Sequence, residues 1–165
     1  MTQSILTPPA RSGRSRQASM LALATILAVT SLVAGLGALT SGGEADPWYA
    51  ALNKAPGTPP GYVFGLVWPV LYALMALGAF VAWRGGARLG LYMAQLIVNL
   101  AWSYLFFSLH QPLPALIDLI VLWGLAFLMI RQFGRHNRIA GAMQLPYLGW
   151  LTFAGYLNVW VVFAN

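Results

Sequence analysis

Five long runs of uncharged, mostly apolar residues occupy nearly the whole chain, and most of the arginines lie in the segments that separate them. A run of about 20 apolar residues can cross a hydrocarbon core of roughly 30 Å. In lipid the backbone must satisfy its own hydrogen bonds, so each run should be a helix. The pattern predicts an all-α, polytopic membrane protein, a bundle of five transmembrane helices. The expected helices cover about residues 20–40, 63–83, 89–109, 113–130 and 142–163.

The composition excludes several classes of protein. Charged residues make up only 7% of the 165 positions, whereas soluble domains contain about 25%. The net charge is +6, but the arginines are dispersed along the chain, so no nucleic-acid partner is expected. The chain has no cysteine, two histidines and three acidic residues. These numbers predict no metal site, no hydrolytic catalytic centre and no required cofactor.

The arginines also predict how the chain is oriented in the lipid bilayer. They lie before the first run, between the second and third, and between the fourth and fifth, and a five-helix bundle brings these segments to one side. The positive-inside rule then predicts a cytoplasmic N-terminus and a C-terminus on the opposite side. Residues 1–18 are expected to form a disordered basic tail, and residues 19–165 a single membrane domain. The arginines concerned are Arg11, Arg14, Arg16, Arg84, Arg88, Arg131, Arg135 and Arg138.

The connection between the first two runs, residues 41–60, is much longer than the others. Long loops in compact domains are often functional. Trp48 and Tyr49 favour the headgroup boundary of a membrane, and Pro59 and Pro60 restrict the backbone before the second run. Two interpretations follow from these residues: a lid over a cavity, or an interfacial anchor.

One face of the third run carries polar and aromatic side chains. Gln95, Asn99, Trp102 and Phe106 recur at helical spacing and therefore share a face. Amides turned toward lipid are costly, so this face should look into the bundle. The amides then either form hydrogen bonds between helices or contact a ligand.

The second and fifth runs carry similar faces. Trp68 and Tyr72 lie on the second run, and Trp150, Ala154 and Leu157 lie on the fifth. Aromatic faces that meet small residues can enclose a flat apolar molecule, or they can simply fill a core. From these residues alone, core packing is the favoured interpretation.

Asp118 is the one ionisable residue well within an apolar run. An intramembrane carboxylate is a functional candidate by default. No second carboxylate or intramembrane histidine continues a proton relay, so Asp118 is expected to brace the bundle by hydrogen bonding to a neighbouring helix. Gln95 and Asn158 are assigned the same structural polar role, and His110 is interpreted as a solvated turn residue.

Ordered motifs in the first loop and in four of the runs resemble the TspO/MBR family of translocator and tryptophan-rich sensory proteins, formerly called peripheral benzodiazepine receptors. The resemblance covers roughly residues 20–163. The matching residues are Trp48 to Lys54, Pro59-Pro60, Val63-Phe64-Gly65, Trp68 and Leu71-Tyr72; Tyr92, Gln95, Asn99, Trp102 and Phe106-Phe107; Ala115-Leu116 and Asp118; and Pro146-Tyr147-Leu148, Trp150, Phe153 and Leu157-Asn158.

The resemblance implies a five-helix bundle, usually a homodimer, with a cavity beneath the first loop. Members bind porphyrins and related tetrapyrroles, as well as sterol-like ligands, and have a regulatory or transport role. The resemblance makes the first loop a lid that includes Trp48, Tyr49, Pro59 and Pro60. It implies that the ligand contacts Phe64, Trp68, Tyr72, Asn99, Trp102, Phe106, Phe107, Trp150, Ala154 and Leu157.

The departures from the family pattern concern other ligands. Gly57 stands where many members carry tryptophan, and Pro114 stands where vertebrate members carry another tryptophan. Both differences argue against tight binding of the family's synthetic drugs. Trp160 takes the tyrosine position of a sterol-recognition motif, and no basic residue follows it.

Two further hypotheses remain beside ligand binding. One is a light-dependent porphyrin-degrading enzyme in which Trp68 and Trp150 act as redox partners; otherwise no catalytic residue is assigned. The other is a scaffold for partner membrane proteins. Alternating-access transport is less favoured, because the sequence shows no internal repeat and no interrupted helix pair.

Overall fold

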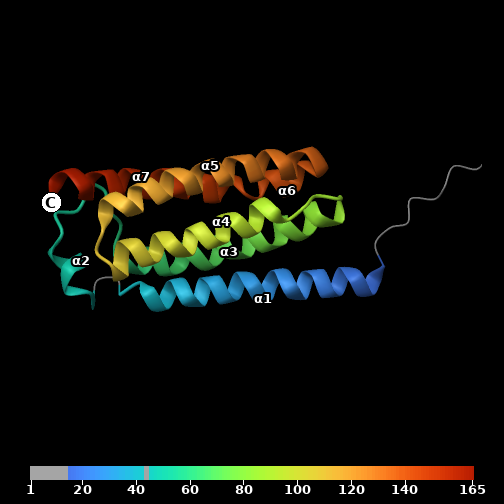
Figure 1. Ribbon diagram of the computed structural model, residues 1–165, viewed down its shortest axis with the longest axis horizontal. Coiled ribbons are helices and arrows are strands. Elements are labelled where there is room, and N and C mark those ends of the chain that lie inside the picture. Colours follow the sequence, from blue (N-terminus) through green and yellow to red (C-terminus); the bar gives the residue numbers. More distant parts are fainter. Residues whose placement is uncertain (1–14, 43–44) are drawn as a thin grey trace, which may run out of the picture.

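A computed structural model describes residues 15–42 and 45–165, and this part of the chain is built of helices without strands. Five long helical segments run side by side (Figure 1). The all-α fold with five membrane-spanning segments is thereby confirmed. The elements are α1 (Arg16–Thr40), α2 (Pro47–Ala51), α3 (Gly61–Arg84), α4 (Gly90–Ser103), the π-helix η2 (Tyr104–Ser108), α5 (Pro112–His136), α6 (Arg138–Ala142) and α7 (Leu145–Ala164).

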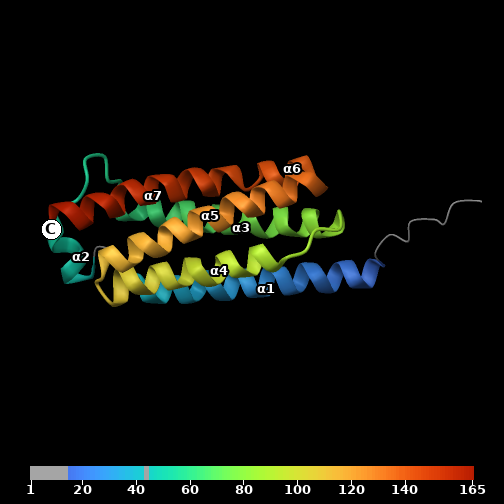
Figure 2. The same cartoon turned by 45° about the horizontal axis from the view of Figure 1, so that its top comes forward.

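The helices pack so that the two ends of the bundle differ. α5 packs against α4 and α7, and α1 covers α3 and α4. The short helix α2 and the C-terminal end of α7 lie at one end, whereas the start of α1, the α3–α4 turn and α6 lie at the other (Figures 1 and 2). All arginines of the described residues belong to the second end, and all are exposed. They are Arg16, Arg84, Arg88, Arg131, Arg135 and Arg138.

Several helix ends differ from those expected. α1 begins at Arg16, inside the expected tail, because the Ser15 hydroxyl caps the helix by accepting a hydrogen bond from the amide of Ala18 at 3.1 Å. Residues 1–14 of that tail lie outside the described part. α5 continues to His136, past the expected end at residue 130, because arginine and glutamine are also good helix formers. Asn137 then caps α6.

A single uninterrupted α-helix was expected for residues 89–109, but the third membrane segment is interrupted. Its last turn widens into the π-helix η2, in which the amide of Leu109 donates to the carbonyl of Tyr104 at 3.0 Å. π-turns occur frequently at functional sites. His110 follows with a positive φ of 54° and ends the segment. The wider turn carries Phe106 and Phe107, whose rings contact each other at 4.9 Å.

Small side chains allow the helices to approach closely in the core. Ala79 and Ala82 of α3 are completely buried. Leu32, Ile97 and Ile120 are more than half exposed and form part of the apolar outer surface. Lipid tails are as apolar as these residues, so close packing and internal polar contacts must hold the bundle together. The outer surface and the five apolar helices establish a multi-pass integral membrane protein.

Candidate ligand-binding site

A small cavity lies where α2 and the following loop cover the bundle. Its free space is about 40 Å³, far below the roughly 300–1,000 Å³ of ordinary ligand pockets. Aromatic side chains occupy most of the room, so a larger ligand requires some of them to move. The cavity is bordered by Tyr49, Lys54, Ala55, Thr58, Phe64, Trp102, Phe106, Phe107, Ala154, Leu157, Asn158 and Val161.

Aromatic contacts hold α2 against the π-helix. The Trp48 ring meets the Phe106 ring edge-on, with centroids 5.6 Å apart. The Tyr49 ring lies 5.6 Å from that of Phe107. Such tilted and edge-on pairs are favourable arrangements of aromatic rings. α2 is therefore seated on the two phenylalanines that border the cavity.

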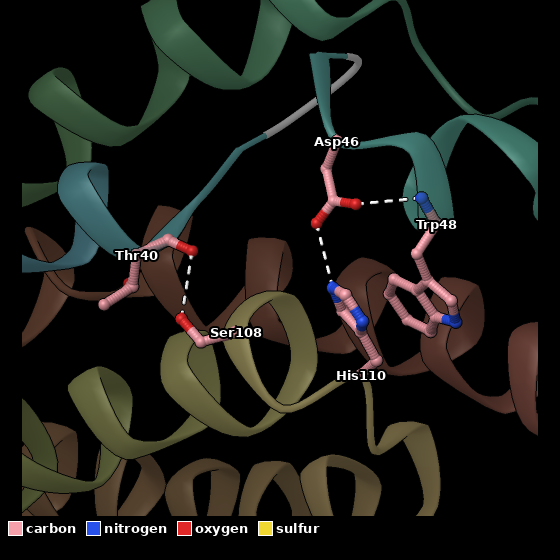
Figure 3. A network of polar contacts seen from close by, with 5 residues as sticks. All are labelled: Thr40, Asp46, Trp48, Ser108 and His110. Atoms are coloured by element: carbon pink, nitrogen blue, oxygen red, sulfur yellow. Dashed lines mark hydrogen bonds and ion pairs between the residues drawn. The ribbon is translucent and has the colours of Figure 1, made fainter.

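Polar contacts fasten the same segment to the α4–α5 connection (Figure 3). One Asp46 carboxylate oxygen accepts from the Trp48 amide at 2.9 Å, and the other lies 3.0 Å from Nε2 of His110. The His110 ring also stacks on the Trp48 indole at 4.4 Å. Nearby, the Ser108 hydroxyl donates to the Thr40 carbonyl at 3.3 Å. His110 is thus more than a solvated turn residue, because it joins this connection to the lid.

The Asp46–His110 contact depends on pH. The hydrogen bond from His110 holds the pKa of Asp46 below its ordinary value, so the carboxylate is charged well into acid. A hydrogen bond to a charged carboxylate is stronger than a neutral one. The charge of Asp46 that strengthens this contact is present at neutral pH and is lost as the pH falls through the lowered pKa of Asp46.

We expect the contact between Asp46 and His110 to slow opening of the lid. The chain has no cysteine, so a single cysteine in an Ala154→Cys variant reports access to the cavity through its rate of reaction with a thiol reagent. Adding His110→Gln should speed the reaction at pH 7.5 by about two- to five-fold, the range typical of a partly exposed polar contact. Equal rates with and without His110→Gln would contradict the expectation.

A buried polar network lies deeper in the bundle and joins three helices. The Tyr72 hydroxyl donates to Oδ1 of Asn99 at 2.7 Å. Nδ2 of Asn99 donates to the Tyr147 hydroxyl at 3.3 Å, and that hydroxyl donates to Oε1 of Gln95 at 2.8 Å. The amides of Gln95 and Asn99 are therefore occupied by hydrogen bonds between α3, α4 and α7.

Four of the residues expected to contact a ligand stand away from the free space. Trp68 packs on the rings of Tyr72 and Tyr147, at 5.5 and 6.5 Å. Trp150 packs on Phe64 at 5.6 Å. Six of the expected residues border the cavity: Phe64, Trp102, Phe106, Phe107, Ala154 and Leu157. The other four do not border it: Trp68, Tyr72, Asn99 and Trp150.

Some cavity residues were not expected from the sequence. Lys54, Ala55 and Thr58 follow α2 and border the free space. The aromatic residues and prolines of this loop stand out in the sequence, and Lys54 carries a usable signal as a basic residue far from the arginines. Pro59 and Pro60 border an open depression on the outer side of the loop instead.

Asn158 and Asp118 were both assigned structural roles, but their surroundings differ. Asn158 borders the cavity and also links helices: its Oδ1 accepts from the Trp102 indole at 3.2 Å, and its Nδ2 donates to the Pro112 carbonyl at 2.8 Å. The Asp118 Oδ2 is buried without a hydrogen-bond partner among the described residues. The bracing hydrogen bond expected of Asp118 is not found at this oxygen.

Among residues 15–42 and 45–165, no three acidic or histidine side chains lie close enough together to hold a metal ion.

Comparisons with known proteins agree with the family resemblance seen in the sequence. The model of the TspO/MBR family matches residues 22–163. The translocator protein of Bos taurus is 39% identical over 136 residues, which are 78% of this chain and 80% of the relative. The tryptophan-rich protein TspO of Archaeoglobus fulgidus is 35% identical over 148 residues, 87% of this chain and 95% of the relative. The tryptophan-rich sensory protein of Cereibacter sphaeroides is 36% identical over 137 residues, 81% and 85% of the two chains. This multi-pass membrane protein belongs to the TspO/MBR family.

Proposed function

We propose that the protein binds porphyrins or related tetrapyrroles, and more generally flat sterol-like molecules, in the cavity beneath α2, and that binding has a regulatory or transport role. The observation that carries the proposal is a covered cavity with aromatic and aliphatic walls and few polar groups. Such a site suits a large apolar ligand. Trp102 and Phe106 stack with their rings 21° from parallel and offer flat faces to a planar ring.

The small free volume makes opening part of the proposed function. A porphyrin cannot enter about 40 Å³ of free space when ligand pockets normally measure several hundred. Tyr49 and Phe106 border the cavity and pack against each other, with centroids 6.4 Å apart. Displacing α2 separates these two rings and enlarges the space between α4 and α7. Ligand binding should therefore be coupled to movement of α2.

The proposed orientation in the membrane follows from the exposed arginines. The positive-inside rule favours the arginine-rich end for the cytoplasm. The N-terminus then faces the cytoplasm, whereas the lid and the C-terminus lie on the opposite side. The proposed assembly is the homodimer that the family resemblance implies.

A fluorescence titration tests binding directly. Protoporphyrin IX is added in the dark to the protein in lipid nanodiscs, with empty nanodiscs as the control for partition into lipid. Saturable quenching of tryptophan fluorescence, with one site per chain, supports the proposal. Quenching that rises linearly and equally in both samples contradicts it and leaves the scaffold hypothesis.

Illumination of the same sample separates binding from the enzymatic alternative. Light-dependent loss of the porphyrin spectrum that disappears in Trp68→Phe or Trp150→Phe, with binding retained, would support degradation. A porphyrin spectrum that stays unchanged in the illuminated parent protein would exclude it. Neither tryptophan is among the residues that border the cavity, so binding is expected to survive these substitutions.

A further inference from the structure

The cavity contains a single charged group among the described residues that border it, the ammonium of Lys54. This side chain is half-buried. Its Nζ lies 4.8 Å from the centre of the Tyr49 ring and donates to the Ala50 carbonyl at 3.3 Å. α2 therefore holds the cation close to the cavity.

The other polar side chains near Lys54 are already engaged. The Thr58 hydroxyl donates to the Ala55 carbonyl at 2.7 Å. Both amide atoms of Asn158 have partners. A lysine ammonium has three donors, and Lys54 uses one of them on the Ala50 carbonyl. In the described ranges, the ion pair present is that of Asp46 with His110, so Lys54 has no carboxylate partner there.

Lys54 also stands at the entrance of the cavity. It borders the inner free space and the open depression outside, which Gly57, Pro59 and Pro60 help to line. A ligand whose apolar body fills the inner space would place a polar substituent at this boundary. The position suits an anionic group that remains partly in water.

We propose that Lys54 binds a carboxylate of the ligand, so that the site selects flat apolar molecules that carry a carboxylate at one edge. The inference rests on the proposed function and narrows its ligand class. A charge-assisted hydrogen bond to a carboxylate is about twice as strong as a neutral one, and the apolar walls strengthen it further. The same contact would hold α2 over the bound ligand.

The free acid and the dimethyl ester of protoporphyrin IX form a matched pair of probes. Both are titrated in the dark at pH 7.5 into the parent protein, Lys54→Gln and Lys54→Arg, in nanodiscs of zwitterionic phosphatidylcholine. The parent should bind the acid about ten-fold more tightly than the ester, as expected for a hydrogen bond to a charged group. Lys54→Gln should bind the two equally, and Lys54→Arg should restore the preference.

Arg88→Gln is the control for net charge, because Arg88 is exposed at the opposite end of the bundle. It should keep the parent's preference for the acid. The inference is overturned if Lys54→Gln retains that preference, or if Arg88→Gln loses it to the same extent. Any loosening of the lid by Lys54→Gln affects both probes alike, so the ratio of the two affinities remains the measure.

The outcomes also separate this inference from the proposed function. Saturable binding of acid and ester with equal affinity in the parent would refute the role of Lys54 and leave porphyrin binding intact. Absence of saturable binding for both probes would contradict the two together. An acid preference that disappears only when anionic lipid is added would show lipid phosphate competing for the same cation, and would support Lys54 as the anion-binding group.

Discussion

Replacing Ala154 with phenylalanine is expected to abolish porphyrin binding while leaving the bundle folded. Ala154 is only 7% exposed and borders a cavity with about 40 Å³ of free space. A phenyl ring at this position fills that space and opposes the opening that a ligand needs. Overpacking should destabilise the fold by about 1–3 kcal/mol. We expect the Kd to rise at least ten-fold, or about 1.4 kcal/mol, in the dark titration with protoporphyrin IX.

Val159→Phe is the matched control for the Ala154 variant. Val159 lies on the same helix, α7, but is 40% exposed on the outer surface. This substitution adds a phenyl ring without touching the cavity, so the Kd should stay that of the parent. Equal binding by the two variants would place the ligand elsewhere, whereas equal loss would indicate a general effect of the added ring.

The second large effect is expected for Gly141→Ala, which should destabilise the fold. A Cβ at Gly141 would lie 2.9 Å from the Cα and 3.0 Å from the amide nitrogen of Gly134, and 3.1 Å from the Ile130 carbonyl oxygen. These are backbone atoms of α5, which cannot move aside as a flexible side chain can. We expect a loss of about 1–3 kcal/mol in the free energy of unfolding, measured as a lower Tm in detergent.

Gly134→Ala provides the opposite control in the same contact. A Cβ at Gly134 meets no atom within 4 Å, and alanine is favoured over glycine inside a helix by up to about 1 kcal/mol. The Tm should therefore stay the same or rise. A fall of equal size in both variants would show that α5 and α6 do not approach each other as closely as described.

The five membrane segments could be predicted because lipid imposes a simple rule: apolar runs of sufficient length must be helical. Two features at the end of the bundle that carries the lid could not be predicted from the sequence. α2 has only five residues, and its one local signal is Asp46 followed by Pro47, a cap and first helical residue. The π-turn of η2 has no comparable signal, because hydrophobic periodicity does not register one extra residue in a turn.

The candidate site was predictable where it depends on side chains that recur on helix faces. Phe106 and Ala154 were expected from such patterns and from the family resemblance, and the structure brings them to the cavity. The contact between Asp46 and His110 joins residues 64 positions apart and depends on how the lid is placed. The position of Lys54 at the cavity could not be predicted for a similar reason, because its surroundings exist only when the loop is folded against the bundle.

A crystal structure with a bound dibrominated deuteroporphyrin would test the central claim most directly, because the anomalous signal of bromine locates the ligand without bias. The account predicts one porphyrin per chain between α2 and the aromatic residues of η2, with Phe106 displaced and a ligand carboxylate near Lys54. Bromine peaks on the outer, lipid-facing surface, with the cavity side chains unmoved, would contradict it.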